Sequence, residues 1–344
     1  MKNLDERIED RVFIFAGYAD VMMRVLFQDL FQRDDVLVVE KLLPFREYVN
    51  GLLRGLVMRL YTHKLCQNGL YLMEKIYRPL ERAGAGDREA YILFTNGASI
   101  GVSVPYLKSF LRRHEKCVPV MLFMDSQHRY WAKYAKFLVD SIPQFRCFTF
   151  DPKDAQENGF QYTMNVYSRH EPAPDGEESD IYFSFFGLDR FDFVREAGDY
   201  LKEGHVRCRF VHVGEPAREK SECGVIEQVP GRLDYFDILR DAAASNCLLE
   251  ILRPGQCGST LRYYEAVCYN KKLLTTNRNV VNLPFYDPRF MKIFEKPSDI
   301  DCEWVRRREP VDYHYDGRFS PVYFLEEIQR IEHERGEANG KTVD

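Results

Sequence analysis

The stretch "NCLLEILRPGQCGSTLRYYEAVCYNKKLLTT" (residues 246–276) decides the fold. An apolar run at 246–252 is followed by a loop with two glycines, a helix-like stretch from Thr260, and a second apolar run at 272–276. A strand, a crossover helix and a second strand predict two parallel strands of one sheet. The loop before the helix then lies at the carboxyl end of the first strand, where such sheets bind ligands.

The same alternation of apolar runs and amphipathic stretches extends along most of the chain. Several runs, such as 120–124, are apolar at every position, which suits strands covered on both faces. Further predicted strands lie at 11–17, 35–42, 90–97, 118–125, 145–150, 181–187, 207–214 and 223–229.

A polar break at 168–180, rich in proline, glycine and acidic residues, separates the two halves. The sequence therefore predicts an α/β protein of two doubly wound Rossmann-like domains facing a cleft. The predicted parts are an amino-terminal Rossmann-like domain (1–167), a linker (168–180), a carboxy-terminal Rossmann-like domain (181–320), and a helix with a polar tail (321–344).

Composition excludes several classes of function. The 344 residues carry a formal net charge of -5, which argues against nucleic-acid binding. The nine cysteines include no CxxC pair, so we expect reduced thiols and no zinc site. The charged start "MKNLDERIEDR" does not resemble a signal peptide, and no window approaches the ~18 apolar residues of a membrane span. A cytoplasmic location is expected.

The glycine loop at 255–260 carries the strongest candidate site. Backbone N–H groups at a helix start, together with the helix dipole, bind anions such as a diphosphate. Arg262 adds a guanidinium, and Glu265 could accept hydrogen bonds from two ribose hydroxyls. The alternative is that Ser259 or Thr260 only caps the helix and Glu265 is a solvated charge. The residues assigned to this site are Gln256, Gly258, Ser259, Thr260, Arg262 and Glu265.

Two further turns are candidates in the same half. In "FFGLDR", Gly187 ends a strand, and Asp189 and Arg190 open the next helix, so that Arg190 could stabilise a leaving diphosphate. A strand-to-helix turn with an Asp cap is the alternative. In "EQVPGRLDYFDILRDA" (227–242), a strand end, a Pro-Gly turn and a helix carry Val229 and Tyr235, and aromatic residues at helical spacing are more often core.

The amino-terminal half offers weaker candidates. Asp20, Asp125 and His128 each follow a predicted strand, and they form the pool from which a general base for an acceptor hydroxyl would come. Each is equally a helix cap or loop residue. The stretch 46–64 interleaves basic and apolar residues, which predicts either an ordinary core-facing helix or a peripheral contact with the inner face of the cytoplasmic membrane.

The segment "EAVCYNKKLLTTN" (265–277) resembles, without gaps, the stretch written EAMACGKPVIATN in many two-domain GT-B glycosyltransferases. The wider patterns "IYFSFFGLDRFDFV" and "CFTFDPKDAQENGFQY" resemble a bacterial family of lipopolysaccharide or capsule biosynthesis. The resemblance implies that Glu265 holds a nucleotide ribose and that the glycine loop faces the donor diphosphate. It further implies transfer of a sugar from a nucleotide-sugar donor bound by domain 181–320 to a glycan or lipid-linked acceptor on the side of domain 1–167, with Val229 and Tyr235 near the nucleobase. No metal and no cofactor besides the nucleotide sugar are expected, because the arginines and the helix dipole supply the positive charge.

The chain departs from that family at one informative position. Retaining members carry a second glutamate about eight positions before the ribose glutamate, where this chain has Cys257. The stereochemistry therefore stays open. A catalytically silent GT-B-like protein that binds a nucleotide or acts as a scaffold remains an alternative, as does a sugar-nucleotide epimerase of the same architecture.

Overall fold

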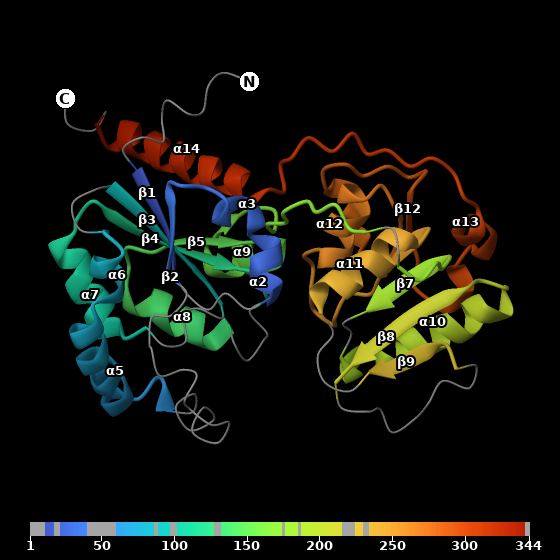
Figure 1. Ribbon diagram of the computed structural model, residues 1–344, viewed down its shortest axis with the longest axis horizontal. Helices are drawn as coiled ribbons and strands as arrows, with labels where there is room; N and C mark the ends of the chain where they lie inside the picture. Colours follow the sequence, from blue (N-terminus) through green and yellow to red (C-terminus); the bar gives the residue numbers. More distant parts are fainter. Residues whose placement is uncertain are drawn as a thin grey trace. The chain divides into compact units, whose positions relative to one another are not determined.

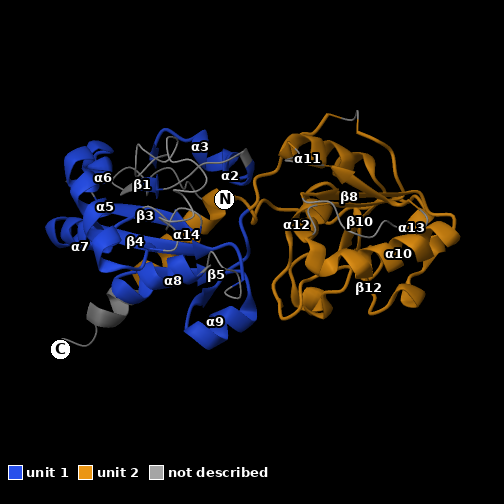
Figure 2. Cartoon of the chain, turned by 90° about the horizontal axis from the view of Figure 1, so that it is seen from below, with its two compact units in different colours: residues 1–166 blue, residues 167–344 orange. Residues whose placement is uncertain are grey.

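The computed structural model divides into two compact units, 1–166 and 167–344, which are described separately (Figure 2). The residues it describes are 11–16, 21–39, 60–85, 89–96, 102–126, 132–173, 176–184, 187–214, 224–229 and 234–340.

The first unit is built on a parallel sheet of six strands in the order β2-β1-β3-β4-β5-β6 (Figure 1). The strands are β1 (Arg11–Ala16), β2 (Val36–Val39), β3 (Glu89–Thr95), β4 (Cys117–Phe123), β5 (Arg146–Thr149) and β6 (Gln161–Tyr162). The described helices are α2 (Val21–Leu26), α3 (Gln28–Phe31), α5 (Lys64–Tyr77), α6 (Pro79–Arg82), α7 (Val104–Arg113), α8 (Ala132–Ser141) and α9 (Pro152–Asn158).

Local sequence explains where these elements begin and end. β3 is buried at all but its first position, as an interior strand of a parallel sheet requires. α7 begins after Ser103, whose Oγ accepts a hydrogen bond from the Tyr106 N–H at 3.2 Å. α9 ends at Gly159, which adopts the left-handed φ of 67° that glycine tolerates best. Side chains of α7 and α8, including Phe110 and Leu138, pack with the strands in one core.

The second unit contains another six-stranded parallel sheet, in the order β12-β11-β10-β7-β8-β9 (Figure 1). The strands are β7 (Ile181–Ser184), β8 (Cys208–Val213), β9 (Ile226–Val229), β10 (Cys247–Glu250), β11 (Lys272–Thr275) and β12 (Met291–Ile293). The α-helices are α10 (Phe191–Glu203), α11 (Tyr235–Ala244), α12 (Leu261–Cys268), α13 (Cys302–Arg306) and α14 (Pro321–Gly340), and the 3-10 helices are η1 (Leu188–Arg190), η2 (Arg278–Asn282) and η3 (Pro297–Asp299).

Helices cover both faces of this second sheet. α10 and α13 share one core with the strands, through side chains such as Val194, Leu201 and Trp304. α11 lies across the sheet from α10 (Figure 2). The prediction of two doubly wound α/β units is therefore confirmed, because each sheet is parallel and flanked by helices. Sequence reasoning missed the short edge strands β6 and β12, which have two and three residues.

The predicted linker 168–180 belongs to the second unit in this division of the chain. Its end packs against the sheet, because the carbonyls of Ser179 and Asp180 accept hydrogen bonds from the N–H groups of Asn246 and Cys247 at 3.1 and 3.0 Å. Within the described ranges, no helix combines the length and the apolarity needed to cross a bilayer.

Candidate functional site at the carboxyl ends of β7 and β10

The strand order of the second sheet creates a switch point between β7 and β10. The chain runs from β7 outward through β8 to β9, and then returns to place β10 on the other side of β7. At such a point the loops that follow the two central strands diverge, and the crevice between them binds ligands in doubly wound sheets. The loops concerned are those that follow β7 and β10.

Two arginines and one glycine lie at this switch point. Arg190 is buried, and its Nη1 donates a hydrogen bond to the Ile251 carbonyl at 2.8 Å, so the loop after β7 is joined to the loop after β10. Arg253 follows β10, is 27% exposed, and lies 3.4 Å from Asp189 through Nε and Oδ2. At Gly187, a Cβ atom would approach Asp189 Oδ1 to 2.6 Å, so a side chain at this position would displace the aspartate.

Arg253 was not singled out from the sequence, although a signal for it was present. It lies three residues beyond Glu250, the last residue of β10, and directly before a proline, which predicts a loop at the carboxyl end of a strand. A cation in that position is suited to a phosphate ligand. The structure thus adds Arg253 to the predicted residues Gly187, Asp189 and Arg190.

The start of α12 differs from the prediction in a specific way. Thr260 caps the helix, because its Oγ1 accepts a hydrogen bond from the Arg262 N–H at 3.2 Å. The Thr260 N–H and hydroxyl both donate to the carboxylate of Glu250, at 2.6 and 2.9 Å, and Thr275 donates to the same carboxylate at 2.6 Å. The backbone N–H of Thr260 expected to face a diphosphate is therefore already bound to a buried side chain. Burial raises the pKa of Glu250.

The other loop residues also make internal contacts. The Gln256 amide donates to the carbonyl of Gly258 at 2.8 Å, and Ser259 Oγ accepts a hydrogen bond from Asn277 at 3.1 Å. Gly258 and Ser259 are buried. The loop is thus packed onto the end of β11 and the turn that follows it, which restricts the approach of a ligand from that side.

Arg262 and Glu265 form a buried ion pair. Their side chains are 5% and 0% exposed, with Nη1 and Oε2 2.6 Å apart and a second contact from Nη2 to Oε1 at 2.9 Å. Tyr235 donates to Glu265 Oε1 at 2.9 Å, and the Arg262 guanidinium lies over the Tyr182 ring at 5.7 Å. Burial raises the pKa of Glu265 to about 7, against the opposing effects of Arg262 and Tyr235.

This arrangement corrects the picture of Glu265 as a solvated surface charge. The ion pair must open before Arg262 or Glu265 can bind a nucleotide, because both side chains are buried in this conformation. Tyr235 is likewise buried and held by Glu265, so it does not present a ring for stacking. Its neighbour Phe236 is 49% exposed.

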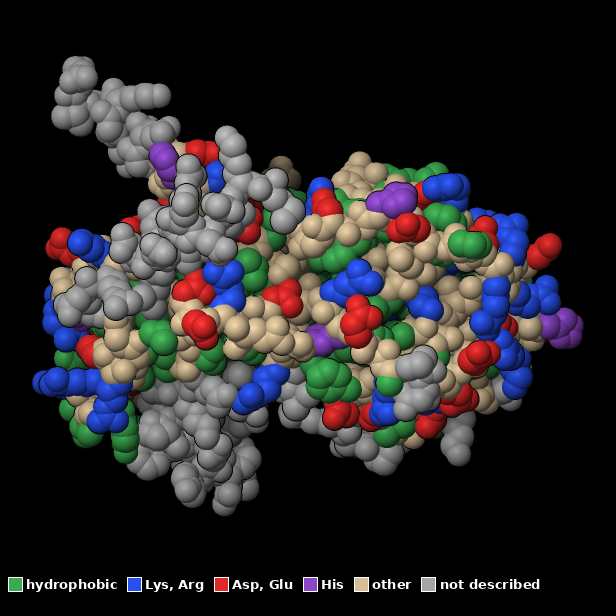
Figure 3. Space-filling model, turned by 45° about the horizontal axis from the view of Figure 1, so that its top comes forward, with side chains coloured by type: hydrophobic (Ala, Val, Ile, Leu, Met, Phe, Trp, Pro, Cys, Tyr) green, Lys and Arg blue, Asp and Glu red, His purple; other side chains and the backbone are tan. Residues whose placement is uncertain are grey.

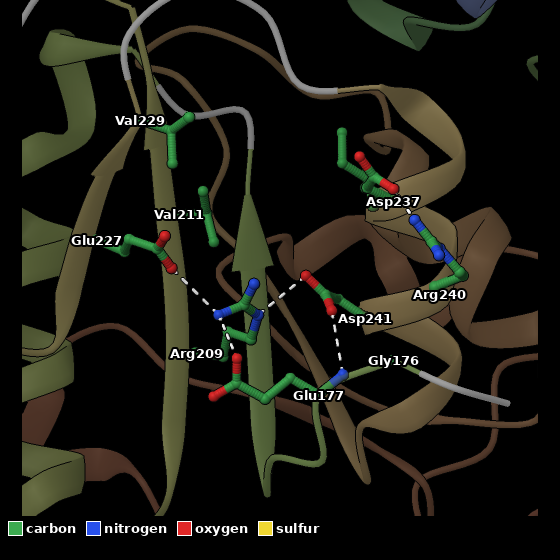
Figure 4. A pocket seen from close by; sticks show the side chains of 10 residues that line it. Gly176, Glu177, Arg209, Val211, Glu227, Val229, Asp237, Arg240 and Asp241 are labelled. Atoms are coloured by element: carbon green, nitrogen blue, oxygen red, sulfur yellow. Dashed lines mark hydrogen bonds and ion pairs between the residues drawn. The ribbon is translucent and has the colours of Figure 1, made fainter.

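Val229, the predicted base contact, lines a cavity of about 290 Å³ between β8, β9 and α11 (Figure 4). Arg209 lies within this cavity and pairs with Glu177, Glu227 and Asp241 at 2.7, 3.1 and 2.9 Å. Since carboxylates outnumber the arginines in its lining, the cavity is unsuited to a diphosphate.

Of the predicted general bases, only Asp125 lies within the described residues. It follows β4 and is exposed. Asp20 and His128 lie outside the described residues, as does most of the stretch 46–64. Within the described ranges, no group of three or more His, Cys, Asp or Glu side chains is arranged to hold a metal ion.

No protein-family model matches the chain, and no curated protein matches it. Among solved structures, it is similar to the glycosyltransferase SnogD from Streptomyces nogalater, with 12% identity, coverage of 86% of this chain and 90% of that chain, and a TM-score of 0.45. It is similar to a UDP-forming α,α-trehalose-phosphate synthase from Burkholderia xenovorans, with 9% identity, coverage of 86% and 90%, and a TM-score of 0.48. It is also similar to S. aureus TarM, with 9% identity, coverage of 63% and 48%, and a TM-score of 0.42. Because these TM-scores lie below 0.5, the chemistry of this chain is inferred from its own residues.

Proposed function

We propose that this protein is a metal-independent glycosyltransferase that moves a sugar from a nucleotide-sugar donor to a glycan or glycolipid hydroxyl. The observation that carries the proposal is the pair of arginines, Arg190 and Arg253, beside Gly187 at the switch point of the second sheet. A parallel sheet with helices on both faces binds nucleotides at such a point. The resemblance of 265–277 to the donor segment of GT-B enzymes supports the same ligand.

The two arginines have different roles in this proposal. Arg190 is fixed by the Ile251 carbonyl and supplies a preorganised positive charge. Arg253 is partly exposed and is tethered to Asp189 by a pair that a phosphate could replace. Both would stabilise the charge that develops on the leaving nucleoside diphosphate, which removes the need for a metal. The base that deprotonates the acceptor would come from Asp20, Asp125 or His128.

The setting of the reaction is also part of the proposal. We infer a role in bacterial surface polysaccharide assembly, in the cytoplasm, from the resemblance of the wider sequence patterns to lipopolysaccharide and capsule enzymes.

Titration calorimetry with nucleoside diphosphates tests the role of Arg253. The Arg253→Ala variant is expected to bind about 10- to 100-fold more weakly than the wild type, because a charged hydrogen bond is worth roughly 1.5–3 kcal/mol. Arg278→Ala is the matched control, since Arg278 is an exposed arginine of the same unit that pairs with Glu295. Equal affinity of the Arg253→Ala variant and the control would remove Arg253 from the site.

A panel of UDP, GDP, CMP and TDP sugars then tests the activity. Thermal shift identifies the bound donor, and release of the nucleoside diphosphate or monophosphate reports transfer or hydrolysis. The alternative of a catalytically silent nucleotide-binding protein is favoured by Cys257 and by the closed Arg262–Glu265 pair. It predicts stabilisation by a donor without release in the presence of any acceptor, whereas failure of every donor to bind would contradict both readings.

A further inference from the structure

Helix α5 presents the reverse of the usual amphipathic pattern. Its buried residues are Gln67, Leu70 and Glu74, two of which are polar. Gln67 donates to the Tyr61 carbonyl at 2.6 Å and accepts from the Val104 N–H at 2.8 Å. These directional contacts fix which side of α5 faces inward.

Glu74 strengthens this orientation. Both of its carboxylate oxygens accept a hydrogen bond from the Ser103 N–H, at 3.1 Å each, at the start of α7. A rotation of α5 that turned Glu74 outward would break these hydrogen bonds, at a large cost in free energy. The outward face of α5 is therefore specified by the fold.

That outward face is aliphatic. Leu65, Leu72 and Ile76 are 75%, 62% and 70% exposed, the highest values among the large hydrophobic side chains of the described residues. At 3.6 residues per turn, the three side chains fall within an arc of about 40° on the helix. Three protruding aliphatic side chains in one line mark an interaction surface. We call these three residues the α5 stripe.

The surroundings of the α5 stripe are basic. Between Lys64 and Arg82, along α5 and α6, every exposed charged residue is basic, although the whole chain has a net charge of -5. The two acidic residues of this stretch are Glu74, which is buried, and Glu81, which is half-buried and pairs with Arg113. Figure 3 shows hydrophobic side chains beside Lys and Arg side chains at the lower left, where α5 and α7 lie in Figure 1. The exposed basic residues of this stretch are Lys64, Lys75, Arg78 and Arg82.

We propose that the α5 stripe and its lysines bind a membrane surface that contains anionic lipid. Aliphatic side chains on a convex helix enter the boundary between headgroups and acyl chains, while lysines beside them contact lipid phosphates. Charge complementarity favours this occupant over a second copy of the chain, since the same basic face on both copies would repel. The proposal concerns the first unit and does not rest on the proposed function.

Vesicle co-sedimentation of the full chain tests this assignment. Binding is expected to vesicles of phosphatidylcholine with phosphatidylglycerol, to weaken in phosphatidylcholine alone, and to weaken as salt increases. The Leu65→Ser/Ile76→Ser variant should bind at least about tenfold more weakly, because several methylene groups no longer enter the lipid. Val281→Ser/Tyr323→Ser is the matched control, because both residues are exposed hydrophobics of the second unit.

Three results would overturn the proposal. These are no binding to either vesicle, equal binding of the two double variants, or a concentration-dependent dimer that the Leu65→Ser/Ile76→Ser variant loses, which would assign the α5 stripe to a second copy. Circular dichroism should show unchanged folding, because the substituted side chains are exposed. The Leu65→Ser/Ile76→Ser variant should bind nucleoside diphosphates as tightly as the wild type. A negative result in the vesicle experiment therefore does not contradict the proposed glycosyltransferase function.

Discussion

Arg253 and Arg262 lie nine positions apart and show how environment decides what an arginine does. The Arg262 side chain is 5% exposed and is held by the Glu265 carboxylate, whereas Arg253 is 27% exposed and pairs with a half-exposed aspartate. A buried pair fixes both of its members, while a partly solvated pair exchanges easily with a phosphate. The first arginine therefore stabilises the fold, and the second is available to a ligand.

Substitution of these two arginines should separate stability from binding. Arg262→Ala is expected to lower the free energy of unfolding by roughly 3–5 kcal/mol, because it leaves the Glu265 carboxylate buried without its counter-charge. Arg253→Ala should change it by less than about 1 kcal/mol. Chemical denaturation measures both values. Equal free energies of unfolding for the two variants would contradict a stabilising role of the Arg262–Glu265 pair.

From the sequence, Arg262 and Glu265 are predicted to contact a nucleotide, and the structure adds that the two side chains are buried against each other. The segment resembles a donor site, but sequence spacing does not reveal that Tyr235 and Arg262 close over Glu265. Glu250 was missed for a related reason. A glutamate within an apolar run indicates only a strand, and its contact with Thr260 arises from the fold of the loop.

At the scale of elements, the connection between α5 and α7 rests on Glu74. Burial raises the pKa of this carboxyl to about 8, despite the hydrogen bonds from Ser103 that favour the charged form. Between the ordinary value of 4.5 and about 8, the folded protein keeps a proton that the unfolded chain has released. The contribution of Glu74 to stability is therefore present below this window and is lost as the pH rises through it.

The Glu74→Gln variant should consequently lose part of the pH dependence. The melting temperature of the wild type is expected to fall between pH 5 and pH 8.5, and that of Glu74→Gln to fall less, because a neutral amide has no proton to release. Glu265 contributes in the same direction, so some slope remains. Parallel melting curves of the two proteins across this range would show that Glu74 is charged in the folded state.

Most strands and helices could be predicted from the sequence, because short apolar runs alternate with amphipathic stretches in a pattern typical of a parallel α/β sheet. The apolar runs at 90–97 and 118–125 correspond to β3 and β4, and the stretch from Thr260 corresponds to α12. The strands β6 and β12 could not be predicted, because two or three residues show no periodicity. The outward orientation of α5 also escaped prediction, since it depends on the hydrogen bonds of Gln67 and Glu74 with residues beyond α5.

At the scale of the whole molecule, each of the two units has its own sheet and its own switch point. In the first sheet the strand order changes direction between β1 and β3, and in the second between β7 and β10. The second carries the arginines suited to a diphosphate, while the predicted base Asp125 follows β4 of the first. Under the proposed function, the donor would bind the second unit and the acceptor the first.

We propose that the carboxyl ends of β7 and β10 hold the diphosphate of a nucleotide. A crystal structure with the nucleoside diphosphate selected by calorimetry tests it most directly. Phosphate oxygens are expected beside Gly187, within hydrogen-bond distance of Arg253, with the contact between Arg253 and Asp189 released. Phosphates bound instead in the cavity around Arg209, or at any site that leaves Arg253 on Asp189, would contradict it.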